Sequence, residues 1–308
     1  MRIGTRGSAL ALAQSEHVLA CLPGGASEHR LVIIKTSGDL NPGASLSRIG
    51  GKGVFTKEIE EALLREEIDL AVHSLKDLPT DERPGLRLGA LLPREDPRDA
   101  LVSRAGIPLE SLRSGATIGT SSLRRRSQIL ARRPDLRVTE LRGNVPTRLE
   151  RLEDGRLDAI VVAAAGLNRL RLGDRATQLL DESVMLPAPA QGVLAIQIRS
   201  GDRAAAAAVE PLSDETATAE ATAERALLQG LGGGCLVPVG ARARAHATNG
   251  TLELVAYVGH PEGRPSFRSS ASGPKARAAD LGRSLAVAML GQGARPILDE
   301  VRSMERFP

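Results

Sequence analysis

The alternation of apolar and polar positions predicts strands and helices in turn along the first hundred residues. The short apolar runs "RIGT", "RLVIIKT" and "DLAVHSL" have the length of strands, and the segments "SALALAQSEHVLACL" and "TKEIEEALLREE" between them have the length of helices. The same alternation begins again at residue 117 with "TIGT", "SSLRRRSQILARR", "LRVTEL", "VPTRLERLEDG" and "LDAIVVAAAGL". The two units also share sequence, because the "IGT" of residues 3–5 recurs at residues 118–120. We therefore predict two related α/β lobes.

Two proline-containing segments connect these units and predict how the chain passes between them. The first, "LPREDPRDALV", joins the lobes, and the second, "LPAPAQGVLAIQIR", leads into a further strand near residues 193–199. A doubled crossover of this kind, in which the chain returns to its first lobe, is how two-lobed binding proteins form a cleft with a hinge. From about residue 217, a helix, a glycine-rich loop and the strand pattern "TLELVAYVG" predict a smaller α+β domain. The expected division is residues 1–97 with 190–212, residues 98–189, and residues 213–308.

Charge and composition narrow the class of ligand. The 308-residue chain has a net charge of +4, and arginine supplies most of its positive charge, which favours anionic ligands. Aromatic residues make up only 1% of the chain and leave little for single-stranded bases to stack on, so small carboxylates or phosphates fit better than nucleic acid. No apolar run approaches a membrane span and no signal-like segment is present, so we expect a cytoplasmic protein. Cys21 and Cys235 are too different in context to indicate a disulfide framework.

Polar residues follow the predicted strands at the ends where parallel α/β sheets bind ligands. Helix N-termini at these ends present unsatisfied N–H groups and a partial positive charge. Six arginines lie there, and the planar guanidinium group suits two-pronged binding of a carboxylate. These are Arg6, Arg124, Arg125, Arg142, Arg148 and Arg169. We interpret Arg126, Arg132 and Arg133 instead as parts of a solvated helix face.

The stretch "VHSLKDLPT" places Lys76 and Asp77 directly after a buried strand and before a proline. Asp77 could simply cap the following turn, which is a common role of Asp at such a position. Among so many arginines, a lone carboxylate can also stabilise a cation that forms during a reaction. For His73, a structural hydrogen bond is the favoured role.

Two glycine-rich segments have their own interpretations. "GGKGVFTKEIEEAL" lacks the spacing of a phosphate-binding Walker loop and is better read as a mobile flap. "LLQGLGGGCLVPVG" places Cys235 behind three glycines, which predicts a tight loop that presents its cysteine. A buried small side chain beside a turn is the ordinary alternative for a free cysteine.

The sequence resembles the porphobilinogen deaminase family, also called hydroxymethylbilane synthase, from end to end. The resemblance rests on nine motifs in the family's order and approximate spacing. They are "RGSALALAQ", "GGKGVFTKE", "AVHSLKDLPT", "REDPRDAL", "IGTSSLRRRSQ", "LRGNVPTRLERL", "AAAGLNRL", "PAPAQGVLAIQIR" and "LGGGCLVPVG".

The resemblance implies an α/β fold and a reaction. The fold has two related lobes like those of periplasmic binding proteins, joined by a doubled crossover, and a small C-terminal α+β domain. The reaction is that of a transferase in tetrapyrrole and heme biosynthesis, which condenses four porphobilinogen units head to tail with loss of ammonia. The product grows on a dipyrromethane cofactor, which the family holds by a thioether to the cysteine at the position of Cys235. Hydrolysis then releases linear hydroxymethylbilane.

The resemblance also implies roles for individual residues, and it implies a site that uses no metal ion. Asp77 corresponds to the catalytic carboxylate beside the pyrrole nitrogens. The implied cofactor-binding residues are Cys235, Lys76, Asp77, Thr120, Ser121, Ser122, Arg124, Arg125 and Arg148. The implied substrate-binding residues are Arg6, Ser8, Arg142 and Arg169. The chemistry of the reaction agrees with these roles. Each pyrrole carries two carboxylates, which arginines can bind, and loss of ammonia creates a delocalised cation that needs a nearby anion.

Two residues depart from the family pattern: Ala190 stands where glycine is common, and Gln197 where glutamate is common. Both lie in the second crossover and bear on its hinge geometry more than on the chemistry.

Two other functions are compatible with parts of the sequence. The first is a non-catalytic two-lobed receptor for a small anion, which gives Cys235 no role, and the second is a nucleic-acid-binding protein that uses "LRRRSQ". We expect a monomer that binds porphobilinogen as its substrate and binds neither nucleic acid nor a membrane.

Overall fold

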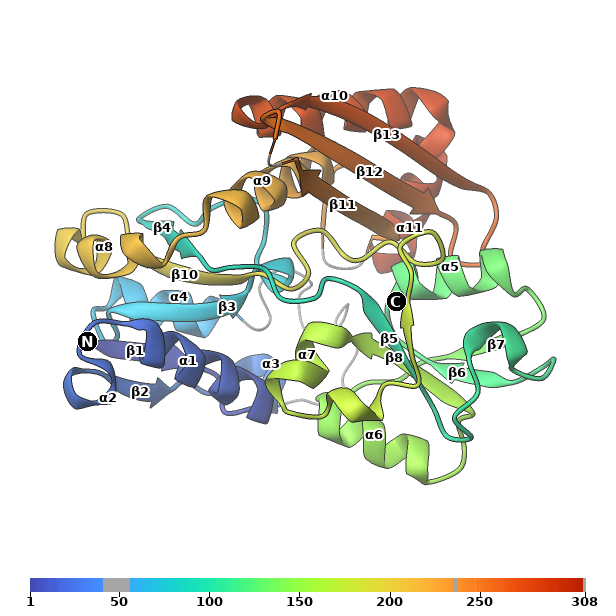
Figure 1. Ribbon diagram of the computed structural model, residues 1–308, viewed down its shortest axis with the longest axis horizontal. Coiled ribbons are helices and arrows are strands. Elements are labelled where there is room, and N and C mark those ends of the chain that lie inside the picture. The colour runs from blue at the N-terminus through green and yellow to red at the C-terminus, as the bar shows by residue number, and fades with distance from the viewer. Residues whose placement is uncertain (41–55, 235–236, 247, 307–308) are drawn as a thin grey trace. The chain divides into compact units, whose positions relative to one another are not determined.

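The computed structural model describes residues 1–40, 56–234, 237–246 and 248–306. Its contacts divide the chain into two compact units, residues 1–95 with 192–218 and residues 96–191 with 219–308. Figure 1 labels the helices and strands of both units. Among the described residues, no helix is long and apolar enough to cross a membrane.

The first unit is built on a five-stranded sheet of order β2-β1-β3-β10-β4 (Figure 1). Its strands are β1 (Arg2–Thr5), β2 (Arg30–Ile33), β3 (Leu70–Ser74), β4 (Leu86–Leu91) and β10 (Leu194–Arg199). Its helices are α1 (Ala9–Cys21), α2 (Gly25–Glu28), α3 (Ser37–Leu40), α4 (Lys57–Leu64), α8 (Arg203–Val209) and the 3₁₀ turns η1 (Leu75–Asp77) and η4 (Glu210–Leu212). Strand β1 is parallel to β2 and β3, whereas β10 runs antiparallel between β3 and β4.

Apolar side chains on both faces of this sheet hold the helices in place. Val18 of α1 packs with Ile3 and Leu70 on one face, and Leu63 of α4 packs with Ala71 on the other. Burial on both faces explains why the strands appear as continuous apolar runs in the sequence. The sheet order also confirms the predicted return of the chain, because β10 follows the second lobe in sequence but lies within the first sheet.

The second unit contains a second five-stranded sheet, of order β7-β6-β8-β5-β9. Its strands are β5 (Asp99–Ser103), β6 (Thr117–Gly119), β7 (Arg137–Thr139), β8 (Ala159–Ala163) and β9 (Gln178–Leu180). Its helices are α5 (Leu123–Arg132), α6 (Val145–Glu153), α7 (Ala164–Arg169) and the 3₁₀ turns η2 (Leu109–Ser111) and η3 (Gly173–Arg175). The two sheet orders are equivalent, with one antiparallel strand, β10 or β5, inserted at the same place. This equivalence confirms two related α/β lobes with a doubled crossover.

The C-terminal part of the second unit is the predicted α+β domain. Its antiparallel sheet consists of β11 (Val239–Ala245), β12 (Thr251–Gly259) and β13 (Ser266–Pro274). Its helices are α9 (Glu215–Gly230), η5 (Lys275–Arg277), α10 (Ala278–Met289), the π-helical turn η6 (Leu290–Ala294) and α11 (Arg295–Arg306). Helix α10 lies along this sheet (Figure 1), and its Leu285 shares a core with Leu254 of β12. The exact limits of the three predicted domains stay a prediction.

Helix α5 joins this domain to the second lobe. The Ser127 and Tyr257 hydroxyls are 2.8 Å apart and buried. At Gly263 a Cβ atom would lie only 2.6 Å from the backbone of Ala131, so glycine permits the close approach. The lobe and the C-terminal domain therefore pack as neighbours within one unit.

The interpretation of Arg126 and Arg133 as solvated helix residues is wrong. Arg126 donates to the carbonyl of Val138 at 2.8 Å and pairs with Glu262 at 2.7 Å. The Arg133 side chain is only 17% exposed and donates to three backbone carbonyls, those of Leu109, Glu110 and Leu112. Their hydrogen-bond partners are distant in sequence, so helical spacing alone does not reveal them.

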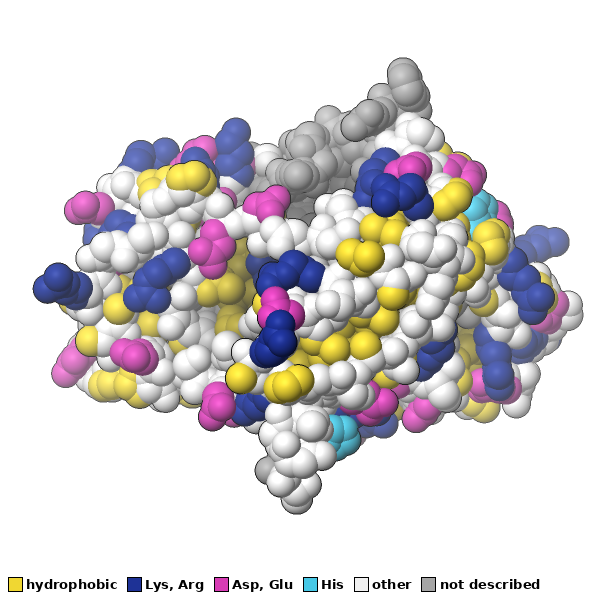
Figure 2. Space-filling view, turned by 90° about the horizontal axis from the view of Figure 1, so that it is seen from above, with side chains coloured by type: hydrophobic (Ala, Val, Ile, Leu, Met, Phe, Trp, Pro, Cys, Tyr) yellow, Lys and Arg dark blue, Asp and Glu magenta, His cyan; other side chains and the backbone are white. Residues whose placement is uncertain are grey.

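Lysine and arginine side chains do not form a continuous patch on the face seen in Figure 2. There, basic side chains alternate with acidic ones and with apolar areas. On that face, acidic side chains therefore lie close to the basic ones and offset their charge.

Candidate functional site

Asp77 lies at the carboxyl end of β3. The strand stops at Ser74, and the chain turns into η1, whose Leu75 is fully buried and donates its backbone N–H to Val193 at 3.0 Å. Gln14 of α1 donates to the Ser74 hydroxyl at 2.9 Å and fixes the end of the strand. Asp77, two residues beyond the buried leucine, is exposed. The turn is therefore anchored at its first residue and presents its carboxylate at the edge of the sheet.

Two predicted substrate-binding residues lie at the same edge of the first sheet. Arg6 directly follows β1, and the Ser8 hydroxyl caps α1 by accepting the Ala11 N–H at 3.3 Å. Because β1 and β3 are parallel neighbours, their carboxyl ends meet, and the structure brings Arg6 and Ser8 to the edge that carries Lys76 and Asp77.

The three predicted hydroxyl residues of the second lobe follow β6. Ser122 caps α5 by accepting the Arg125 N–H at 3.4 Å, and Thr120 accepts the N–H of Ser122 at 3.2 Å. Ser121 donates to the carbonyl of Leu141 at 2.8 Å. The hydroxyls thus shape the loop before a helix N-terminus, a place that suits an anion.

Arg124 and Arg125 are buried around a carboxylate that the sequence analysis did not name. Arg124 donates to Asp99 at 2.6 Å, and Arg125 donates to the other oxygen of Asp99 at 2.8 Å. Their side chains are 4% and 7% exposed, and that of Asp99 is 0% exposed. Burial alone would raise the pKa of Asp99, but the two guanidinium groups hold it well below its usual value. Asp99 lies in the "REDPRDAL" motif, and only its position at the start of an apolar strand hints that it is buried.

The other three predicted arginines lie at the equivalent edge of the second sheet. Arg142 follows β7 and pairs with Glu140 at 2.5 Å. Arg148 lies on the first turns of α6 and donates to the carbonyl of Gly143 at 2.7 Å. Arg169 is the last residue of α7, which follows β8. All three are half-buried, and β6 runs parallel to both β7 and β8, so they gather at one edge.

Cys235 and residues 50–55 of the predicted flap lie outside the described residues. Two of the glycines that precede Cys235 lie where a larger residue would be strained or would clash. Gly232 has a φ of +78°, and a Cβ atom at Gly233 would lie 2.7 Å from the carbonyl oxygen of Leu228. The turn after α9 therefore requires glycine at both positions.

Both departures from the family pattern have a structural explanation. Ala190 is fully buried with a φ of +63°, the left-handed conformation that favours glycine, and its N–H donates to Glu224 at 2.5 Å. Gln197 of β10 donates to the Glu60 carboxylate at 3.1 Å in a buried environment. A glutamine there avoids burying two carboxylates within hydrogen-bond distance.

His73 is buried on the face of the first sheet that α4 covers, and its Nε2 atom has no hydrogen-bond partner in the described part of the chain. The structural hydrogen bond expected of His73 is therefore not made at this nitrogen. Burial lowers the pKa of His73 to about 4, while Gln197 opposes the shift and Arg6 adds to it.

We expect the protonation of His73 to weaken the fold in mild acid. Because its pKa is depressed in the folded state, the unfolded chain takes up a proton first, and stability falls between about pH 6.5 and about pH 4. A His73→Gln variant should lose this part of the pH dependence, on the order of 3 kcal/mol over that range. Urea unfolding of both proteins at several pH values measures the difference. Parallel pH profiles would show that His73 is not the group responsible.

The structure thus contains two equivalent sheets with an exchanged strand. Their carboxyl ends carry basic and hydroxyl side chains, and the first also carries the exposed carboxylate of Asp77. These features define a two-lobed α/β protein equipped for small anionic ligands. The chain belongs to the porphobilinogen deaminase family. The family model "Porphobilinogen deaminase, dipyromethane cofactor binding domain" matches residues 1–207, and the model of the C-terminal domain matches residues 218–291.

Curated relatives match over nearly their whole length. The chain is 46% identical to a porphobilinogen deaminase of Syntrophobacter fumaroxidans, with 98% of this chain and 97% of the relative covered. It is 47% identical to that of Thermus thermophilus, with 97% and 98% covered. Among solved structures, the VFT2 domain of Bordetella pertussis BvgS aligns with a TM-score of 0.39 and 14% identity over 68% of this chain and 84% of that chain.

Proposed function

We propose that this chain is a porphobilinogen deaminase that builds hydroxymethylbilane from four porphobilinogen units on a dipyrromethane cofactor held by Cys235. The observation that carries this proposal is the match of the family's cofactor-binding domain across residues 1–207. The half-buried arginines at the sheet edges support it, since a chain of pyrroles with two carboxylates each requires many guanidinium partners. When bound, the cofactor supplies the nucleophilic pyrrole carbon at which the first substrate is joined.

The residues of the chain bind substrate and stabilise charge. Asp77 is the candidate catalytic carboxylate, because it stands at a sheet edge among cations and can offset the positive charge that develops when ammonia leaves. Arg6, Ser8, Arg142 and Arg169 are the candidate substrate-binding residues, and Lys76, Thr120, Ser121, Ser122 and Arg148 are candidates for holding the cofactor. Arg124 and Arg125 remain candidates too, with their orientation set by Asp99. We place the enzyme in the cytoplasm as a monomer, with porphobilinogen as its substrate.

The purified protein should be heavier than its sequence by two pyrrole units, and limited porphobilinogen should produce a ladder of heavier species spaced by one pyrrole. The reason is that a covalent tether retains every partial product until release. Mass spectrometry of the intact protein and peptide mapping around Cys235 measure both. An unmodified Cys235 in active enzyme, or free oligomers with a constant protein mass, would contradict the proposal.

A further inference from the structure

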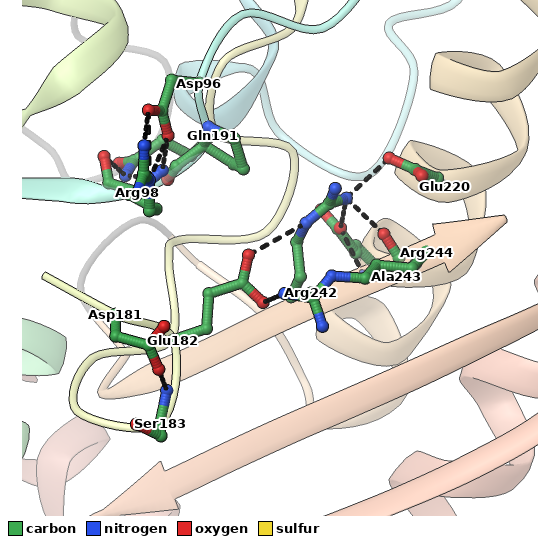
Figure 3. Close-up of polar contacts among 12 residues, drawn as sticks. Asp96, Arg98, Asp181, Glu182, Ser183, Gln191, Glu220, Arg242, Ala243 and Arg244 are labelled. Atoms are coloured by element: carbon green, nitrogen blue, oxygen red, sulfur yellow. Dashed lines mark hydrogen bonds and ion pairs between the residues drawn. The ribbon is translucent and has the colours of Figure 1, made fainter. Parts of the chain in front are cut away.

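Arg242 of β11 is surrounded by three carboxylates from two different segments (Figure 3). It contacts Glu182 at 3.3 Å, Glu220 at 2.6 Å and Glu224 at 3.8 Å, and it also donates to the backbone carbonyl of Ala243. The Arg242 side chain is 13% exposed, so these contacts are largely shielded from solvent. A planar guanidinium group with several donors can join partners in this way, whereas a single ammonium group holds fewer of them in place.

The three carboxylates belong to two parts of the fold. Glu182 lies after β9, in the segment of residues 181–193 that links β9 to β10 and contains the start of the second crossover. Glu220 and Glu224 lie on α9, whose end at Gly230 opens the loop that carries Cys235, and β11 begins where that loop closes. Arg242 therefore connects the second crossover to both elements that frame the loop.

Backbone contacts run beside this network. The N–H of Ala241 on β11 donates to the carbonyl of Pro187 in the crossover at 2.9 Å. Glu224, fully buried, accepts the N–H of Ala190 from the crossover at 2.5 Å and that of Ala243 from β11 at 2.7 Å. Hydrogen bonds thus join the crossover to β11 directly and through Glu224, next to the cluster of Arg242 with Glu182, Glu220 and Glu224.

The first crossover lies within the electrostatic reach of the same cluster. Its Asp96 and Arg98 pair at 2.6 Å, and the bond to Arg98 chiefly lowers the pKa of Asp96, with a smaller contribution from Arg242. The pairing chiefly raises the pKa of Arg98, and Glu182 adds to the rise. Arg242 and Glu182 therefore act on the segments through which the chain both enters and leaves the second lobe.

We propose that Arg242 is a positioning residue that fastens the second crossover to α9 and β11, so that these two elements, which flank Cys235 in the sequence, move with the crossover and not independently of it. This inference rests on the proposed function, because the loop matters for catalysis only if it carries the cofactor. The contacts described for Arg242 are with three carboxylates and a backbone carbonyl, so we expect its effect on the reaction to pass through the positions of α9 and β11.

The test compares hydrogen exchange of the intact holoenzyme in Arg242→Met, Arg242→Lys and Arg244→Met. Arg244 is a matched control, since it pairs with Glu182 at 2.6 Å from the same strand but is 52% exposed. We expect Arg242→Met to speed exchange about tenfold both in peptides of residues 184–190 and in those of residues 226–234, because coupling through such a network is of that size. Arg242→Lys should show an intermediate increase, and Arg244→Met should show almost none.

The kinetic readout separates positioning from general damage. Normalised to the fraction of protein that carries the cofactor mass, kcat of Arg242→Met should fall about tenfold with little change in KM, since no substrate contact is lost. Should Arg242→Met not fold, Glu182→Gln removes only the crossover side of the network and should give the same exchange pattern at smaller amplitude. Faster exchange in only one of the two segments, or equal effects of Arg242→Met and Arg244→Met, would overturn the proposal. A wild-type protein without the added mass would instead overturn the proposed function and leave the exchange result standing.

Discussion

A Cys235→Ala variant is expected to purify at the mass of its sequence and to have no measurable deaminase activity. Cys235 is the residue at which the family resemblance places the thioether, and without that bond no primer remains to receive substrate. Intact mass and a porphobilinogen consumption assay measure the two effects together. This is the largest change expected of any single substitution in the chain.

The other cysteine provides the control. Cys21 is exposed at the end of α1, so Cys21→Ala should keep both the added mass and the activity. An active Cys235→Ala protein would contradict the tether, as would an added mass that is lost with Cys21.

The repeating α/β architecture could be predicted because it depends on local patterns. Buried parallel strands leave continuous apolar runs, and the capping residues Ser8 and Ser122 precede their helices in the order that helix geometry requires. The return of β10 to the first sheet could also be anticipated, since an apolar strand follows the proline-containing segment after the second lobe. These features require no knowledge of distant partners.

The electrostatic part of the site could not be predicted in the same way. A sequence shows that Arg124 and Arg125 follow a strand, but it does not show that Asp99 is buried between them, because the fold alone brings these residues together. The left-handed conformation of Ala190 is similarly set by its surroundings and not by its own preference. The pairing of Arg242 with Glu182 likewise joins residues 60 positions apart, where no spacing rule operates.

The Asp77→Asn variant is expected to fold and bind porphobilinogen but to react roughly 100-fold more slowly or worse, as when one preorganised electrostatic group is removed from an active site. Asparagine keeps the size and hydrogen-bonding reach of the side chain while removing its charge. Because Asp77 is exposed at the end of a turn anchored by the buried Leu75, the substitution should disturb packing little. Single-turnover formation of the first heavier species isolates this step from product release.

Two further variants decide whether charge or position is responsible. Asp77→Glu keeps the charge but moves it by one methylene, and a displacement of that size can itself cost on the order of 100-fold, so we expect partial activity at best. Asp81→Asn, which removes an exposed acid four residues further along the chain, should react at nearly the wild-type rate. Near-normal deamination by Asp77→Asn, or an equal loss of rate in Asp81→Asn, would mean that the carboxylate of Asp77 is only a turn cap. Another residue would then have to supply the stabilising anion, because a cation on the pyrrole still needs a counter-charge within a few ångströms.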